Sequence, residues 1–361
     1  MSIPIASPDL GIGVLSDVIE TVEGAQLADG PGVRAFEATF ADYCDCEHGV
    51  ATSNGTTALH AALRGLEIGA GDTVVTTPFS FVATANAIRL CGAEPAFADV
   101  DPETLNLDPE SVRAAITARD GEVDAILAVH LYGLPAAMNE LRSIADEYGI
   151  PLIEDAAQAH GARYRGDPVG SLGDVACFSF YPTKNMTTGE GGMVVTDEES
   201  IADRVAQFIN HGRSGRYDHA VVGHNFRLTS IGAAIGQQQL HRLDDFVEVR
   251  RRNAEAYDRA LGDQPAVSAP VEPEGRRHAY HQYTVQCPER ERLREHLDDA
   301  GVDTGVYYPT PIHRQPAYAD CEVTAPEAER AADRVLSVPV HPALDRAAVR
   351  SIADALAGFD P

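Results

Sequence analysis

The sequence predicts an α/β protein, with a mostly parallel central sheet flanked by helices and a smaller C-terminal α+β domain. Two observations support this fold class. Short apolar runs alternate with helical patterns through the first two thirds of the 361 residues, and such a repeat is typical of a parallel sheet covered on both faces. Pro and Gly then concentrate in residues 262–277, after which a smaller pattern begins. A chain of this length suits two packed domains.

The individual elements follow from length and periodicity. Four apolar runs have the length of buried strands: residues 72–78, 94–100, 124–133 and 150–157. Three stretches between or beside them have helical spacing, two of them ending at a glycine C-cap: residues 56–69, 80–92 and 137–149.

A long helix is predicted from Ser230 to Leu261. Its apolar positions include Ile231, Ile235, Leu240, Leu243 and Phe246. The change of pattern after this helix places the domain junction near residues 245–275. We therefore expect a large domain over residues 1–250, which includes the N-terminal segment, and a small domain over residues 251–361.

The charge of the chain excludes one class of function. There are 55 acidic and 28 basic residues, for a net charge of −27, and such a surface repels nucleic-acid phosphates. Acid spread along the chain, scarce lysine and 6% aromatic residues predict a protein from a salt-rich cytoplasm, where the Debye length falls to about 3 Å at 1 M salt. A GC-rich genome that replaces Lys by Arg is the alternative.

The sequence predicts a cytoplasmic protein without metal. No apolar run reaches the roughly 18 residues of a membrane span, and the first residues lack the basic and apolar regions of a secretory signal. The six cysteines show no disulfide framework. Cys44, Cys46 and His48 are a weak zinc signal, because no second ligand pair lies nearby; two small buried thiols are the alternative.

Lys184 is the first candidate for chemistry. It is the only lysine among 28 basic residues. Arginine replaces lysine as a surface cation but not as a nucleophile, because guanidinium stays protonated. A desolvated lysine amine loses its proton and adds to a carbonyl carbon. A sole remaining lysine, between the apolar run 175–181 and the glycines of 189–192, therefore indicates covalent amine chemistry, with a chance survivor in a loop as the alternative.

Two further candidates lie at the ends of predicted strands. Asp155 ends the strand 150–157, and ligands of open α/β sheets bind at the carboxyl ends of strands. Such an Asp can pair with a protonated ring nitrogen, although many are helix caps or buried ion partners. The turn at Gly55, followed by Thr56 and Thr57, exposes backbone amides to a phosphate, but capped turns of this kind are common.

Eight ordered motifs together carry a resemblance that covers nearly the whole chain. They are SNGTTALHAAL, GAGDTVVTTPFSFVATANAI, EDAAQAHGA, GSLGDVACFSFYPTKN, GEGGMVVT, GHNFRLTSIGAAIGQQQL, YYPTPIHRQPAY and SVPVHPAL. The chain resembles the DegT/DnrJ/EryC1/StrS family of sugar aminotransferases, which use pyridoxal 5′-phosphate and have the aspartate aminotransferase-like fold type I. This fold is consistent with the α/β class inferred above.

The resemblance implies roles for residues around the cofactor ring. Lys184 would hold the cofactor covalently and then carry a proton between the substrate and the cofactor. Asp155 would bind the pyridine nitrogen, Gln158 would contact the ring hydroxyl, and Phe81 would stack on the ring. Without the resemblance, Phe81 would be interpreted as a core residue.

The resemblance also implies a phosphate site and a shared active site. Gly55, Thr56 and Ser179 would hold the cofactor phosphate. Asn225, in the motif GHNFRL, would reach the phosphate of the neighbouring subunit, so the active form would be a homodimer.

The implied reaction moves an amino group from L-glutamate or L-glutamine to a nucleotide-linked 3- or 4-keto hexose, for cell-surface glycan or glycoprotein sugar synthesis. Two alternatives remain. Relatives that dehydrate a keto-sugar carry His at the position of Lys184, and a regulatory protein that binds the cofactor without turnover would use the same scaffold. No helix-turn-helix pattern supports DNA binding.

Substrate residues are expected in two further segments. Arg213 lies in the basic segment HGRSGRYDH (211–219), which suits either a diphosphate or a solvated loop. Tyr308 and His313 lie in the motif YYPTPIHRQPAY, and the resemblance implies that His313 faces the sugar.

The excess of negative charge predicts that the protein needs salt. Dialysis from concentrated salt into dilute buffer is expected to unfold the protein, because the repulsion among its excess negative charges is then no longer screened. Circular dichroism and activity, measured before and after dialysis, check this. Retention of fold and activity in dilute buffer would favour the GC-rich genome as the reason for the missing lysines.

Overall fold

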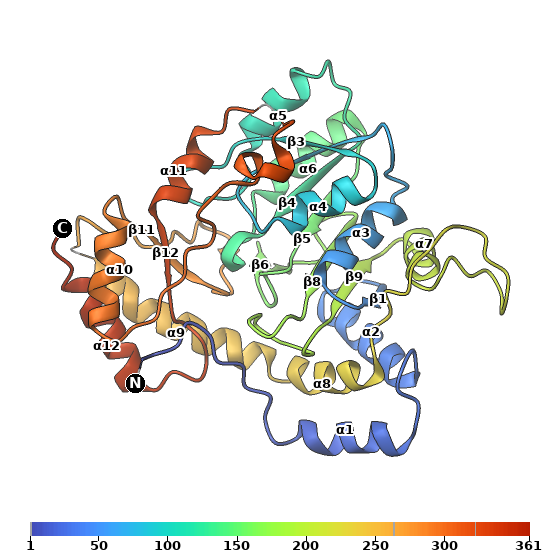
Figure 1. Ribbon diagram of the computed structural model, residues 1–361, viewed down its shortest axis with the longest axis horizontal. Coiled ribbons are helices and arrows are strands. Elements are labelled where there is room, and N and C mark those ends of the chain that lie inside the picture. The colour runs from blue at the N-terminus through green and yellow to red at the C-terminus, as the bar shows by residue number, and fades with distance from the viewer. Residues whose placement is uncertain (1, 263, 322) are drawn as a thin grey trace.

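A seven-stranded sheet forms the centre of the computed structural model, which describes residues 2–262, 264–321 and 323–361 (Figure 1). The strand order is β1-β9-β8-β5-β4-β2-β3. The strands are β1 (His48–Thr52), β2 (Thr73–Thr76), β3 (Glu94–Phe97), β4 (Ala125–Val129), β5 (Leu152–Asp155), β8 (Val175–Ser179) and β9 (Gly192–Thr196). In this sheet β9 runs antiparallel to both of its neighbours, β1 and β8, and the other pairs are parallel, so the prediction of a mostly parallel sheet is confirmed.

Helices cover both faces of this sheet. On one face lie α3 (Gly55–Gly65), α4 (Ala83–Leu90) and α7 (Glu199–Ile209), whose apolar residues share one core with the strands. On the other face lie α2 (Pro31–Tyr43), α5 (Pro109–Thr117), α6 (Met138–Tyr148) and α8 (Ser230–Leu240). Because both faces are buried, the central strands are apolar at successive positions rather than alternating.

A smaller unit contains the C-terminal part of the chain. The pair β11 (Tyr283–Gln286) and β12 (Val335–Val338) is antiparallel and shares a core with α9 (Leu243–Leu261), α10 (Arg290–Asp299) and α12 (Arg346–Ala357). The proposed division between residues 250 and 251 falls inside α9 and stays a prediction. One helix of this half, α11 (Pro326–Arg334), packs its alanines into the core of the large sheet.

The remaining elements are short or peripheral. Helix α1 (Val14–Glu23) lies at the edge of the molecule along α8 (Figure 1). The strands β6 (Arg163–Tyr164), β7 (Asp167–Pro168) and β10 (Arg276–Arg277) form a three-stranded sheet, and short 3-10 turns cover Leu131–Gly133, Ile312–Arg314 and Pro316–Tyr318. Within the described residues, no helix is both long and apolar enough to cross a membrane.

The prediction of one helix from Ser230 to Leu261 was wrong. The segment forms α8 and α9, with a break between them at His241 and Arg242. The amide of Arg242 donates to the carbonyl of Gln239, three residues back, which tightens the chain. The Arg242 side chain bonds to Asp9 at 2.5 Å and lies over the ring of Phe246. The break therefore depends on contacts with the N-terminal segment, which helical periodicity does not record.

The predicted strand 124–133 is also too long. Strand β4 ends at Val129, and Tyr132 has a positive φ of 58°. The Nδ1 atom of His130 accepts the amide of Ala136 at 3.0 Å, and the side chain of Gln158 accepts the amide of Tyr132 at 2.6 Å. These two bonds turn the chain away from the sheet at the edge where the candidate site lies.

The core between α2 and the sheet generates a prediction about stability. Phe40 is fully buried, and its ring lies 4.9 Å from Phe178 and 5.2 Å from Phe180. Phe40→Ala is expected to lower the free energy of unfolding by about 3–5 kcal/mol, because it leaves a cavity among these rings. Tyr217→Ala, at an 80% exposed position, is the control and should change it by less than about 0.5 kcal/mol. Denaturant unfolding at constant salt checks this, and equal effects of the two substitutions would contradict it.

Candidate active site

Asp155 ends strand β5 at the carboxyl edge of the parallel strands. The Thr84 hydroxyl donates to one carboxylate oxygen at 2.8 Å, and the Ala157 amide donates to the other at 3.2 Å. Burial raises the pKa of Asp155, while the bonds from Thr84 and Ala157 and the charge of Lys184 oppose this rise. The two donors fix the orientation of a buried carboxylate that can hold a positively charged partner.

Glu154, the residue before Asp155, fixes the end of β5 through its own hydrogen bonds. Its fully buried carboxylate accepts the amides of Gly170, Leu172 and Gly173 at 2.7–3.1 Å and contacts Nε2 of His130 at 2.9 Å. Since Nδ1 of His130 accepts a backbone amide, its Nε2 carries the proton and donates to Glu154. This network fixes the strand end that carries Asp155.

Lys184 lies in the loop between β8 and β9 and is half-buried. Burial lowers the pKa of its amine to about 8, and the charge of Asp155 opposes this change. The neighbouring Asn185 donates to the carbonyls of Ala279 at 3.0 Å and His160 at 3.4 Å, which holds the loop in place. Among the described residues, the Lys184 amine has no hydrogen-bond partner. It is therefore free to react, and a large fraction of it is unprotonated near pH 8.

The N-terminus of α3 provides an anion site beside β8. Asn54 caps the helix and accepts the amide of Thr57 at 2.9 Å, which leaves the amides of Gly55 and Thr56 without a hydrogen bond within the described parts of the chain. A Cβ atom at Gly55 would lie 2.7 Å from Cβ of Ser179. Only glycine permits this approach, which brings the Ser179 hydroxyl next to the free amides. Two amides, a hydroxyl and a helix N-terminus together suit a phosphate.

Aromatic and amide groups complete the other side of the site. The Gln158 amide group accepts the amide of Tyr132 and donates to the hydroxyl of Tyr308 at 3.0 Å. The ring of Tyr308 lies 5.9 Å from that of Phe81, which is 55% exposed. The Thr84 amide donates to the Phe81 carbonyl at 3.2 Å. Phe81 therefore lies one turn before Thr84, the residue whose hydroxyl bonds Asp155. An exposed ring in this position offers a flat surface to a planar ligand.

These groups fit pyridoxal 5′-phosphate. The cofactor needs an amine for its aldehyde, an acid for its ring nitrogen and donors for its phosphate, and the structure supplies Lys184, Asp155 and the Gly55–Ser179 cradle. Lys184 and Asp155 are close enough for each to affect the other's pKa. The cradle would otherwise be filled by a Cβ atom at residue 55.

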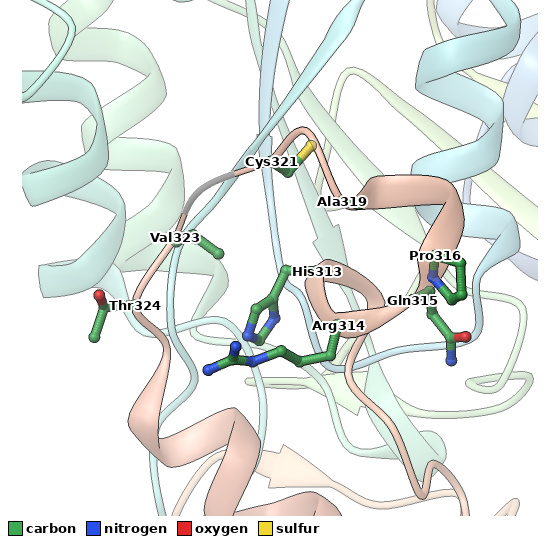
Figure 2. A pocket seen from close by; sticks show the side chains of 8 residues that line it. All are labelled: His313, Arg314, Gln315, Pro316, Ala319, Cys321, Val323 and Thr324. Atoms are coloured by element: carbon green, nitrogen blue, oxygen red, sulfur yellow. The ribbon is translucent and has the colours of Figure 1, made fainter.

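Three sequence-predicted residues lie elsewhere. Asn225 and Arg213 are both exposed and flank the loop 214–223, which extends beyond α7 (Figure 1). His313 is buried, with Nε2 3.0 Å from Glu329, and lines a separate cavity of about 600 Å³ together with Arg314 (Figure 2). Neither Lys184 nor Asp155 lines this cavity. The substrate role of His313 stays a prediction.

Sequence reasoning missed several residues that shape the site. Thr84, Asn185 and Glu154 each lie within a motif quoted for the resemblance. No local pattern shows that Thr84 bonds Asp155, that Asn185 connects the lysine loop to other segments, or that Glu154 bonds the turn after β7. In the described residues no group of three or more His, Cys, Asp or Glu side chains is arranged to hold a metal. Cys44 and Cys46 are buried thiols.

The fold and the site define a pyridoxal-phosphate-dependent aminotransferase of fold type I. The chain belongs to the DegT/DnrJ/EryC1/StrS aminotransferase family, whose model matches residues 11–357.

Known proteins are similar over almost the full length. The chain is 41% identical to a dTDP-3-amino-3,4,6-trideoxy-alpha-D-glucose transaminase of Streptomyces venezuelae, over 94% of this chain and 90% of that protein. It is also 41% identical to a pleiotropic regulatory protein of Geobacillus stearothermophilus, over 94% and 92%. The crystal structure of S. venezuelae DesV with a ketimine intermediate superposes with a TM-score of 0.93, at 38% identity and 98% coverage of both chains.

The lone lysine allows a direct test of the site's electrostatics. Reductive ¹³C-methylation of the cofactor-free protein labels Lys184 and the terminal amine only, and NMR titration should give a pKa of about 8 for Lys184. The amine is protonated below this pH and free above it. Asp155→Asn should lower this pKa further, because it removes the negative charge that favours the ammonium form.

Asp167→Asn, at an exposed position in β7, is the matched control and should leave the Lys184 signal unchanged. A pKa for Lys184 near the ordinary 10.5 would contradict the desolvation of this amine by burial.

Proposed function

We propose that this enzyme transfers the amino group of L-glutamate or L-glutamine to a nucleotide-linked 3- or 4-keto hexose, for cell-surface glycan or glycoprotein sugar synthesis. The observation that carries this proposal is the desolvated Lys184 amine near Asp155, together with the anion site at the N-terminus of α3. The substrate class is supported by the similarity to the S. venezuelae sugar transaminase.

Each residue of the site has a defined task in this proposal. When bound, the cofactor withdraws electrons from the substrate carbon that carries the amino group. Asp155 keeps a proton at the ring nitrogen, since its buried carboxylate favours a cation beside it. Lys184 would carry the proton between the substrate carbon and the cofactor, which its pKa of about 8 allows near neutral pH. Phe81 would cover one face of the cofactor ring, and Gln158 would donate a hydrogen bond to the hydroxyl of that ring.

The remaining cofactor contacts hold the phosphate. Gly55 and Thr56 donate their backbone amides, and Ser179 donates its hydroxyl. This is the contact set that the exposed N-terminus of α3 supports. It leaves the ring end of the site open to the two substrates in turn.

The substrate is proposed to extend toward the exposed segments. Arg213 offers a guanidinium to the diphosphate of the sugar nucleotide. Tyr308, bonded to Gln158 and next to Phe81, contacts the sugar. His313 stays a candidate sugar contact, although its bond to Glu329 would have to break for Nε2 to reach the substrate.

A cytoplasmic homodimer with shared active sites is proposed as the working form. Asn225 is exposed, so it is available to another subunit. Helix α1 also presents exposed apolar side chains at helical spacing, with Leu15 63%, Ile19 57% and Val22 52% exposed. Exposed apolar stripes of this kind are typical of protein interfaces.

Nucleotide sugars are cytoplasmic substrates, and the −27 charge supports a salt-rich cytoplasm.

A regulatory protein that binds the cofactor without turnover is the second candidate, because one close relative is named as a pleiotropic regulatory protein. A keto-sugar dehydratase is less well supported, since Lys184 occupies the position where the dehydrating relatives carry His. Turnover separates the regulatory candidate from the enzyme.

The experiment uses purified protein in high salt with pyridoxal phosphate. We expect a yellow band that bleaches with L-glutamate and returns when a nucleotide keto-sugar is added, with an aminated sugar found by mass spectrometry. Borohydride reduction and peptide mapping should place the cofactor on Lys184. Lys184→Arg, which keeps the charge but removes the nucleophile, should lose both the band and the turnover.

Bleaching without any aminated product from a panel of 3- and 4-keto sugar nucleotides would favour a regulator or another acceptor. A cofactor adduct on the terminal amine alone would contradict the role of Lys184.

A further inference from the structure

The segment from His224 to Arg227 is held rigidly although it lies at the surface. The amides of His224 and Phe226 donate to the carbonyls of Phe208 and Ile209 at 2.7 and 2.9 Å, at the end of α7. The Ser53 amide donates to the Phe226 carbonyl at 2.7 Å. These bonds connect the segment to α7 and to the residue before the α3 cap.

The rings of His224 and Phe226, here called the aromatic pair, stack on each other. Their centroids are 4.5 Å apart and their planes differ by 2°. The pair rests on two buried rings, His60 of α3 and Phe208 of α7, at 5.1–6.1 Å. Burial lowers the pKa of His60 to about 4, so this ring is neutral and adds no charge beneath the pair.

The stacked rings indicate which way the Asn225 side chain points. The segment forms antiparallel bridges at Asn225 with Asn210 and at Arg227 with Thr52, so its backbone is extended. Side chains of an extended chain alternate between two faces. Because His224 and Phe226 both face the body of the subunit, Asn225 faces outward, on the same side as Arg227, whose guanidinium bonds the Asn210 side chain.

We propose that His224 and Phe226 are positioning residues whose stacked rings, seated on His60 and Phe208, hold the Asn225 amide outward for the active site of a second copy of the chain. This inference rests on the proposed function, in which Asn225 binds the cofactor phosphate of the partner. It adds the physical reason why a surface amide can be placed accurately: two large rings on the opposite face prevent the segment from twisting.

The first test measures the affinity for pyridoxal phosphate by absorbance titration. Asn225→Ala should weaken it by about tenfold, the usual effect of losing a bond to a charged group. Phe226→Ala should weaken it by roughly threefold or more, because the amide remains but is no longer held. His224→Phe, which keeps a stacking ring, should retain the affinity. Tyr148→Ala removes a half-buried ring on the opposite face of the sheet and is the matched control.

The second test separates action on the partner from action within the subunit. Differently tagged Phe226→Ala and Lys184→Ala chains are co-expressed. The hybrid is purified through both tags, and its mass is then confirmed as that of a dimer. Its only lysine lies on the Phe226→Ala chain, while the Asn225 that serves this site comes from the other chain, whose aromatic pair is intact. Borohydride labelling counts this site alone, and its affinity should return to that of the unaltered protein.

If the hybrid site stays as weak as the Phe226→Ala homodimer while Asn225→Ala is also weak, the aromatic pair acts only within its own subunit and the inference is wrong. If Asn225→Ala binds the cofactor normally, or the protein is a monomer, the shared site of the proposed function fails first. Should Phe226→Ala not fold, His224→Ala, at an exposed position, replaces it in both tests.

Discussion

The burial of two opposite charges at one edge of the sheet is the constraint on which the rest of the site depends. Asp155 and Lys184 come from different segments and meet where solvent is largely excluded, so burial raises the pKa of the acid and lowers that of the amine. Their mutual attraction opposes both changes. The balance leaves an amine that is reactive near neutral pH beside a carboxylate that attracts a cationic ring.

Such a pair is useful only if neither side chain can move away. Glu154 accepts three backbone amides and the proton of His130, which fixes the strand that carries Asp155. Asn185 connects the lysine loop to the carbonyls of Ala279 and His160, which lie in two other segments. These contacts within the protein give the reactive groups a single geometry before any ligand binds.

The choice between arginine and lysine also depends on whether the side chain must lose its proton. Arginine forms the surface ion pairs, for example with Asp9 through Arg242 and with Glu272 through Arg251, where lysine would serve as well and where each pair contributes little. In the proposed function the amine at residue 184 must lose its proton, which guanidinium cannot do. On that proposal, the single lysine of the chain lies where amine chemistry is needed.

Local pattern and chemical necessity allowed the sequence by itself to determine the α/β class, the mostly parallel sheet, and Lys184, Asp155 and the Gly55 turn as candidates. Periodicity records which face of an element is buried, and Lys184 stands out because its chemistry has no substitute. The roles of Phe81, Gln158, Ser179 and Asn225 came only from the resemblance.

Only the tertiary structure decided how distant segments meet. The break at Arg242 depends on Asp9, the Gln158 amide joins Tyr132 to Tyr308, and the direction of Asn225 depends on rings from α3 and α7. Each of these contacts joins residues far apart in the chain. No local pattern of side chains encodes them, because their partners become neighbours only when the sheet and its helices have packed.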